Sequence, residues 1–246
     1  MSLCPDFDTA EQPPVHLNAD LDLNAYANTS TMSWALSPAP GVHRKPLERI
    51  GGEKVTRATS LVHYAPGSQF DAHIHNGDEE FFVLDGIFSD DSGDFGPGHY
   101  VRNPPHSAHA PFSKDGCTIF VKLGQIPDHD RRSIRVDSRD PKAAWQHNRP
   151  GVRTLPLYTS ADETVSLVRW DAGLKCLPVR FAHGLEIYVL KGAFRDEYGH
   201  HSAGNWMRLA AGQSHAMQIL SSCEALVKTG HLGRHAVGTL DGPERA

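Results

Sequence analysis

The chain has 246 residues, with 24 Lys and Arg against 29 Asp and Glu, so its net charge is −5. Hydrophobic residues make up 39 % of it and charged residues 22 %, a balance that supplies a substantial core and argues against disorder. Without a basic excess, a nucleic-acid-binding protein is not expected.

The four cysteines are scattered and form no CxxC pair, which favours reduced thiols over a disulfide framework or a sulfur-rich zinc site. The 16 histidines indicate instead that any metal ligands are nitrogen and oxygen atoms. No apolar run approaches the roughly 18 residues of a membrane span, and the N-terminus lacks the features of a signal peptide. We therefore expect a cytoplasmic protein without membrane contact.

The predicted elements are all β-strands. Residues 1–30 are expected to form an N-terminal arm that adds a strand near residues 15–17. Runs rich in Val, Leu, Phe and Tyr, separated by Gly or Pro, then predict strands at 59–64, 80–84, 118–123, 164–170, 186–190 and 224–227. With 22 Gly, 17 Pro and no long stretch of helical period, the pattern indicates a sandwich or a small barrel.

An internal repeat organises the chain. A shift of 106 residues places Leu61 on Leu167, and the same register holds without gaps at many later positions. Gly86 then meets Gly192. We expect one domain at residues 31–128 and a second at 129–240, with a polar linker near residues 125–134.

Candidate metal ligands cluster in the first repeat. His73 and His75 are two residues apart on a predicted strand, so both imidazoles point to one face. Glu79 follows across a turn and can enter the same cavity, and a second segment that begins at Gly98 supplies His109 on a hairpin. Because successive side chains of a strand point to opposite faces, Glu80 points away from the cavity when Glu79 points into it.

These two segments resemble the paired motifs of the cupin superfamily, and more narrowly the ChrR-like cupins. The resemblance implies a bicupin, two tandem jelly-roll barrels related by duplication. It implies a metal bound by His73, His75, Glu79 and His109. His106 stands where the motif usually has Gly, which makes it a candidate polar neighbour of the metal.

The second repeat is expected to lack this site. In the 106-residue register, Val179, Phe181 and Leu185 replace His73, His75 and Glu79, and His215 alone keeps the identity of its counterpart His109. The apolar replacements are expected to fill the second barrel. We therefore predict one divalent metal per chain, bound by the first repeat.

Three imidazoles and one carboxylate leave open coordination positions, which is a feature of catalytic rather than structural sites. The resemblance favours an Fe(II)-dependent dioxygenase that cleaves a C–C bond of a small, metal-chelating diketone or hydroxyketone with O2. Zn(II) also fits the donor set. The alternative is a non-catalytic zinc-binding regulatory or sensor cupin like that of ChrR, which the short, Pro-rich N-terminal segment disfavours. A bicupin enzyme with two metal centres is disfavoured by the degenerate second repeat.

Three residues are candidates for polar groups of the substrate pocket: His106, Arg102 and Tyr100. Phe81 and Val83 are expected to line the cavity, on the same strand face as Glu79. After Glu80, the run at residues 80–84 of this strand is apolar on both faces, so its outer face should pack on the other repeat or on a second chain. A homodimer is the expectation that the cupin resemblance carries.

Overall fold

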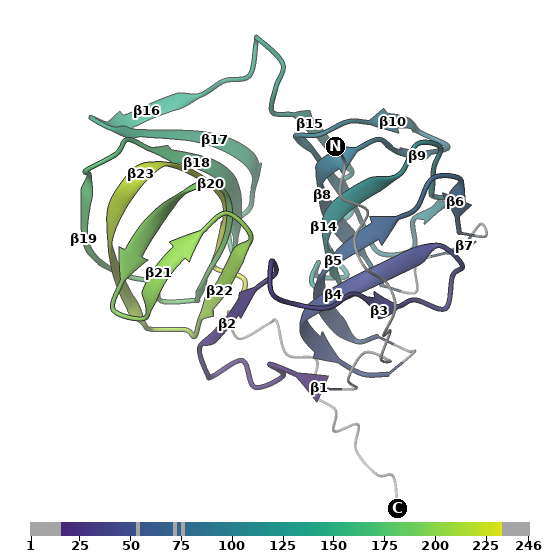
Figure 1. Cartoon of the computed structure of the whole chain (residues 1–246), viewed down its shortest axis with the longest axis horizontal. Coiled ribbons are helices and arrows are strands. Elements are labelled where there is room, and N and C mark those ends of the chain that lie inside the picture. Colours follow the sequence, from purple (N-terminus) through teal and green to yellow (C-terminus); the bar gives the residue numbers. More distant parts are fainter. Residues whose placement is uncertain (1–15, 53–54, 71–72, 75–76, 233–246) are drawn as a thin grey trace, which may run out of the picture.

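A computed structural model describes residues 16–52, 55–70, 73–74 and 77–232, with only the backbone described for residues 73–74. The described residues form strands, turns and loops, and no helix among them could span a membrane. Figure 1 shows two barrels side by side. The predicted all-β bicupin with an internal duplication is therefore confirmed.

The first barrel has a large sheet in the order β1-β4-β5-β14-β8-β11-β15, with β3 paired to β4, and smaller sheets β10-β9-β13-β6 and β12-β7 opposite it. Its strands are β1 His16–Leu17, β3 Ala35–Leu36, β4 Val42–Ile50, β5 Arg57–Tyr64, β6 Ser68–Gln69, β7 His73–Ile74, β8 Glu79–Gly86, β9 Phe88–Asp90, β10 Gly93–Phe95, β11 His99–Asn103, β12 Ala108–His109, β13 Phe112–Ser113, β14 Cys117–Leu123 and β15 Ile134–Asp137.

The second barrel repeats this plan, with a sheet in the order β16-β17-β18-β23-β20-β22-β2 and with β19 and β21 paired to β23 and β20. Its strands are β2 Ala25–Asn28, β16 Gln146–Arg149, β17 Val152–Thr159, β18 Thr164–Trp170, β19 Lys175–Arg180, β20 Leu185–Asp196, β21 Gly199–Ser202, β22 Asn205–Leu209 and β23 Ser214–Thr229. Every strand range predicted from the core of the repeat lies within one of these strands.

The glycines that match across the repeat have a backbone reason. Gly86 and Gly192 both have a positive φ, of 71° and 75°. A Cβ at Gly86 would collide with the carbonyl oxygen of Gly116, and one at Gly192 with that of Ser222. Only glycine fits both the left-handed conformation and the close approach of the neighbouring strand, so the turn persists in both copies.

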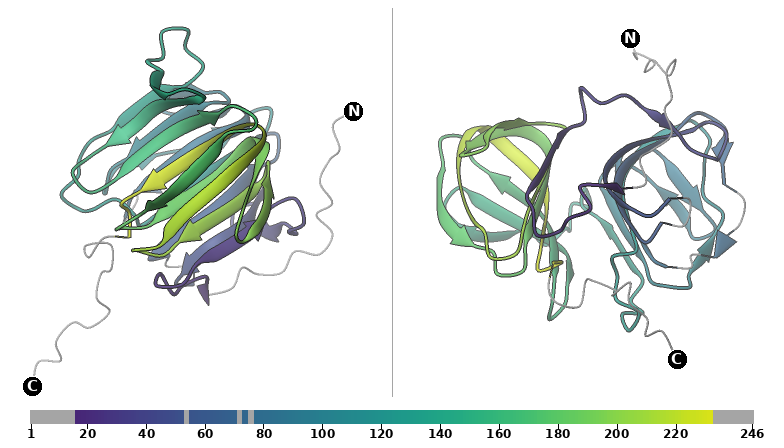
Figure 2. Two further views of the ribbon diagram at one scale, coloured as in Figure 1. Left: turned by 90° about the vertical axis from the view of Figure 1, so that its left-hand side faces the viewer. Right: turned by 90° about the horizontal axis from the view of Figure 1, so that it is seen from below.

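The two barrels exchange one strand each. β2 lies between β1 and β3 of the first barrel in sequence but pairs with β22 of the second barrel. β15 precedes the other strands of the second repeat but pairs with β11 of the first barrel. Figure 2 shows the N-terminal segment that carries β1 and β2 extending between the barrels. The predicted arm strand is confirmed as β1, which pairs with β4. β2 is a finding that the sequence pattern did not predict, and the exchange means that the boundary expected at residue 128 is not the spatial boundary.

The barrels pack together through the outer faces of their large sheets. Phe82 and Phe120 of the first barrel share one apolar cluster with Tyr188 and Leu226 of the second, and the rings of Phe120 and Tyr188 stack with centroids 4.9 Å apart. The strand predicted to be buried on both faces therefore packs on the other repeat.

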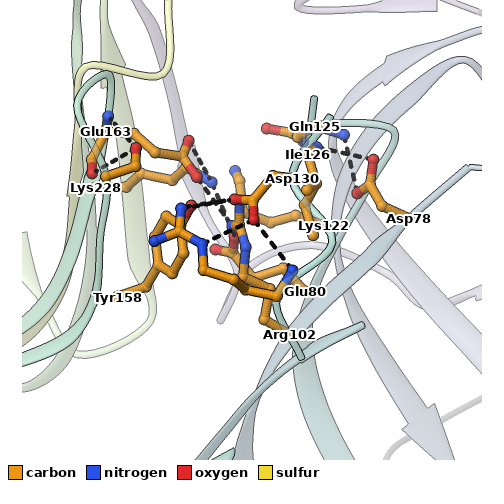
Figure 3. A network of polar contacts seen from close by, with 12 residues as sticks. Asp78, Glu80, Arg102, Lys122, Gln125, Ile126, Asp130, Tyr158, Glu163 and Lys228 are labelled. Atoms are coloured by element: carbon orange, nitrogen blue, oxygen red, sulfur yellow. Dashed lines mark hydrogen bonds and ion pairs between the residues drawn. The ribbon is translucent and has the colours of Figure 1, made fainter. Parts of the chain in front are cut away.

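Buried ion pairs also cross this contact (Figure 3). Lys122 Nζ of the first barrel lies 2.7 Å from Glu186 Oε2 of the second, and Lys228 Nζ of the second lies 2.9 Å from Glu80 Oε2 of the first. The 106-residue shift maps each of these lysines and each of these glutamates onto the other. The ion pairs thus follow the same approximate twofold symmetry as the exchanged strands.

Candidate metal centre

Three of the four predicted ligands lie on strands that the structure describes. His73 begins β7 and is directly opposite His109, the last residue of β12. Glu79 begins β8 and is directly opposite Asn103, the last residue of β11. His75 and the side chain of His73 lie outside the described part of the structure, so their role as ligands stays a prediction.

The two predicted ligands with described side chains converge. Glu79 and His109 are both buried, and Oε2 of Glu79 lies 3.5 Å from Nε2 of His109. Phe81 and Val83, on the same face of β8 as Glu79, belong to the core of the first barrel. Glu80 points the opposite way, to the ion pairs between the barrels. The predicted orientation of this strand is confirmed.

Asp90 contacts Nδ1 of His109, the ring nitrogen that does not face Glu79. Its Oδ2 lies 3.1 Å from Nδ1 of His109. Burial alone would raise the pKa of Asp90, but hydrogen bonds from His109 and Ser92 lower it to about 2. An ionised carboxylate accepts a hydrogen bond from Nδ1–H, which directs Nε2 toward Glu79, the orientation that a metal ligand needs.

Asn103 and Arg135 hold Glu79 in a similar way. Nδ2 of Asn103 donates to Oε2 of Glu79 at 3.2 Å, and Nη2 of Arg135 donates to Oδ1 of Asn103 at 2.7 Å. Sequence reasoning missed Asp90, Asn103 and Arg135. For Asn103, alternation shows only that it lies on the face opposite to that of Arg102, and the register of β11 with β8 decides which face is inward.

Tyr100 and Arg102 are not in the cavity, which corrects the prediction. Tyr100 lies in the apolar cluster between the barrels. Arg102 is fully buried there, with Nη1 2.7 Å from Glu80 and 2.9 Å from Glu163. The physical reason is the antiparallel register with β8: Tyr100 and Arg102 are opposite Phe82 and Glu80, which face the second barrel.

His106 does not lie buried beside the two ligands either. Its side chain is exposed, and its backbone N–H donates to the carbonyl oxygen of Gly77 at 3.3 Å. Its φ of 66° is in the left-handed region, which explains physically why glycine is the usual residue at this position of the motif. The expected pocket role of His106 is therefore corrected to a role in the turn.

The second barrel keeps the geometry without most of the predicted ligands. Val179 is directly opposite His215, as His73 is opposite His109. Leu185 is 2 % exposed and packs in the barrel core, but Val179 is 55 % exposed, so only part of the expected apolar filling is found. His215 contacts Asp196, which also contacts His201.

The donor set fits a divalent metal where it is described. The buried carboxylate of Glu79 and the imidazole of His109, whose Nδ1 contacts Asp90, form half of the predicted set and come from strands of two different sheets, β8 and β12. Among the residues with described side chains there is no group of three His, Cys, Asp or Glu that could hold a metal. A complete site therefore needs the two histidines that lie outside this description.

Comparison with known proteins agrees with a fold of two repeated domains. The model of a family described as the ChrR cupin-like domain matches residues 23–127 and again residues 134–233. No curated protein matches the sequence.

Solved structures resemble the whole chain. A provisionally named dioxygenase from Nostoc punctiforme PCC 73102 superposes with a TM-score of 0.69 at 14 % identity, covering 91 % of this chain and 88 % of its own. A provisionally named glyoxylate-induced protein from Pseudomonas aeruginosa gives a TM-score of 0.69 at 16 % identity, with 95 % and 97 % covered. A variant of oxalate decarboxylase from Bacillus subtilis gives 0.60 at 11 %, with 89 % and 79 % covered. At these identities, the likeness establishes the fold alone.

Proposed function

Because this chain belongs to the ChrR cupin-like domain family, we propose that it is a metal-dependent cupin enzyme with one divalent metal, held by His73, His75, Glu79 and His109 of the first barrel. The observation that carries the proposal is the convergence of Glu79 and His109 inside the barrel, each held by a second polar residue. Similar polar partners of metal ligands orient the ligand and tune the metal in known metalloproteins.

We propose Fe(II) as the functional metal and oxidative C–C cleavage of a small diketone or hydroxyketone by O2 as the reaction, with Zn(II) as the alternative occupant. The metal, when bound, would supply a Lewis-acid and redox centre for a substrate that chelates through two oxygens. The Nostoc structure named provisionally as a dioxygenase supports the reaction class, and the Mn(II) centres of oxalate decarboxylase from Bacillus subtilis support a divalent metal.

The residues of the chain have three tasks in this proposal. Glu79 and the histidines hold the metal, and Asp90 orients the imidazole of His109 through its Nδ1. Phe81, Phe88 and Phe95 lie in the barrel core and exclude water from the interior. Exclusion of water strengthens the electrostatic interactions within the site and protects reactive species from side reactions.

The full-length protein, reconstituted with Fe(II) without oxygen, tests this function in an oxygen electrode. We expect uptake of O2 with at least one of a series of β-diketones and hydroxyacetophenones. Glu79→Gln should lose most of this uptake, and the exposed Glu197→Gln should keep it. Stoichiometric metal binding without O2 uptake on any compound would contradict the enzyme and favour the regulatory zinc-binding module.

A further inference from the structure

Arg135 connects the linker between the repeats to the predicted metal carboxylate. It lies on β15, the strand that leads into the second barrel but pairs with the first. It is directly opposite Val101, a buried residue of the first-barrel core, so both side chains lie on the inner face of the sheet. Nη1 of Arg135 donates to the carbonyl oxygens of Arg102 at 3.1 Å and Ile134 at 2.9 Å. These bonds hold the guanidinium in place although Arg135 is an exposed residue.

The charges at either end determine the orientation of the Asn103 amide. Arg135 can only donate, and the carboxylate of Glu79 can only accept while it is ionised. The amide oxygen of Asn103 must therefore point to Arg135 and the amide nitrogen to Glu79, as the distances of 2.7 Å and 3.2 Å have it. A reversed amide would place two donors together at one end and two acceptors together at the other. The three residues thus form a directed chain of hydrogen bonds that ends on Glu79.

The second barrel provides an internal control for this chain of hydrogen bonds. β2 takes the place of β15 there, and Tyr26 is opposite Met207 as Arg135 is opposite Val101. Leu209 and Leu185 are paired where the first barrel pairs Asn103 and Glu79. All three polar positions are apolar or aromatic in the copy that lacks the predicted ligands.

The pair of Asp90 and His109, by contrast, has a counterpart in the second barrel. Asp196 and His215 are retained in the second barrel at the positions of Asp90 and His109. Since both barrels contain an exchanged strand, a residue needed only to attach that strand would be expected in both copies. Arg135 and Asn103 occur only together with Glu79.

We propose that Arg135 is a positioning residue for the metal centre, which orients Glu79 through Asn103. This inference rests on the proposed metal centre. It means that the segment leading into the second barrel completes the site of the first, so the site depends on residues outside the family's first matched segment, 23–127.

The sign of the effect separates positioning from simple electrostatics. Removal of a positive charge near a cation site would by itself strengthen metal binding, because like charges repel. Loss of a residue that orients the carboxylate should weaken binding instead, by about 10-fold to 100-fold for such a partner of a ligand. The direction of the change is therefore diagnostic.

The full-length protein without metal, titrated with Co(II) and followed by visible absorption, tests the proposal. We expect Arg135→Met and Asn103→Ala each to raise the dissociation constant about ten-fold and to change the absorption bands. The double variant should bind no more weakly than the weaker single variant, because both act on Glu79 along one path. Arg132→Met is the matched control, since Arg132 lies on the same linker and contacts Asp130.

Binding of Co(II) by Arg135→Met that is unchanged or tighter, or effects of the two substitutions that multiply, would overturn the proposal while leaving the metal centre intact. Failure of the wild-type protein to bind Co(II) would overturn the metal centre itself and this inference with it. Thermal unfolding of the metal-free variants should match that of Arg132→Met, and a much larger loss in Arg135→Met would identify a purely structural role.

Discussion

Neighbouring residues of β8 and β11 contribute to different parts of the molecule. Glu79 and Asn103 face the barrel interior, and Glu80 and Arg102 face the second barrel. Alternation along a single strand predicted the orientation of Glu79 and Glu80 correctly. It could not orient Arg102, because the facing of β11 depends on its register with β8, and register is a property of the folded sheet.

His231 is buried, and Oε2 of Glu186 lies 3.9 Å from its Nε2. Neither ring nitrogen has a hydrogen-bond partner among the described residues, and burial together with Lys122 and Lys228 lowers its pKa well below 6.5. Such a histidine stays neutral in the folded state but takes up a proton in the unfolded state. The unfolded state is therefore favoured as the pH falls below the pKa that the histidine has there.

We therefore expect the free energy of unfolding to decrease as the pH falls below about 6.5, by up to about 1.4 kcal/mol per pH unit from this residue. His231→Leu should show a shallower decrease between pH 7.5 and 5.5 in urea denaturation. The exposed His200→Gln should keep the slope of the wild type. A His231→Leu slope equal to that of the wild type would disprove this assignment.

At the scale of elements, the exchanged strands and the crossed ion pairs attach each barrel to the other. Lys122 is 1 % exposed and Glu186 3 %. Burial is the largest influence on Lys122 and lowers its pKa, while Glu186 and Glu48 act in the opposite direction. Such a pair is retained at little net gain, but removal of one partner leaves an uncompensated charge in the interface.

Lys122→Met should accordingly lower the free energy of unfolding by about 3 to 5 kcal/mol. Lys122→Met combined with Glu186→Leu should recover a large part of this loss, because no unpaired charge is left. Arg169→Met removes the partly exposed pair with Glu224 and should cost less than about 1 kcal/mol. Chemical denaturation of the four proteins measures this, and a double variant as unstable as Lys122→Met would count against the interpretation.

On the scale of the whole molecule, one chain supplies both halves of the contact between barrels. The outer face of β8 was expected to pack on the second repeat or on a second chain, and in the structure it packs on the second repeat. The homodimer stays a prediction, without support from this face. The asymmetry lies in the interiors, since one barrel has Glu79 and Asn103 where the other has Leu185 and Leu209.

We expect close to one equivalent of metal per chain, measured by elemental analysis after reconstitution. His109→Ala should lose most of the metal, and His215→Ala, its counterpart in the second barrel, should keep it, because Val179 and Leu185 cannot act as ligands. Two equivalents per chain, or a large loss in His215→Ala, would show that the second barrel binds metal.

The sequence by itself determined the duplication, the all-β fold and the difference between the two repeats, because glycine turns, strand periodicity and residue identities are local and repeat at a fixed shift. Only the tertiary structure decided that β2 and β15 are exchanged, that Tyr100 and Arg102 lie between the barrels, and that Arg135 reaches Glu79 through Asn103. These features depend on the register of strands far apart in the chain, and many pairings fit the same local pattern until the barrels pack.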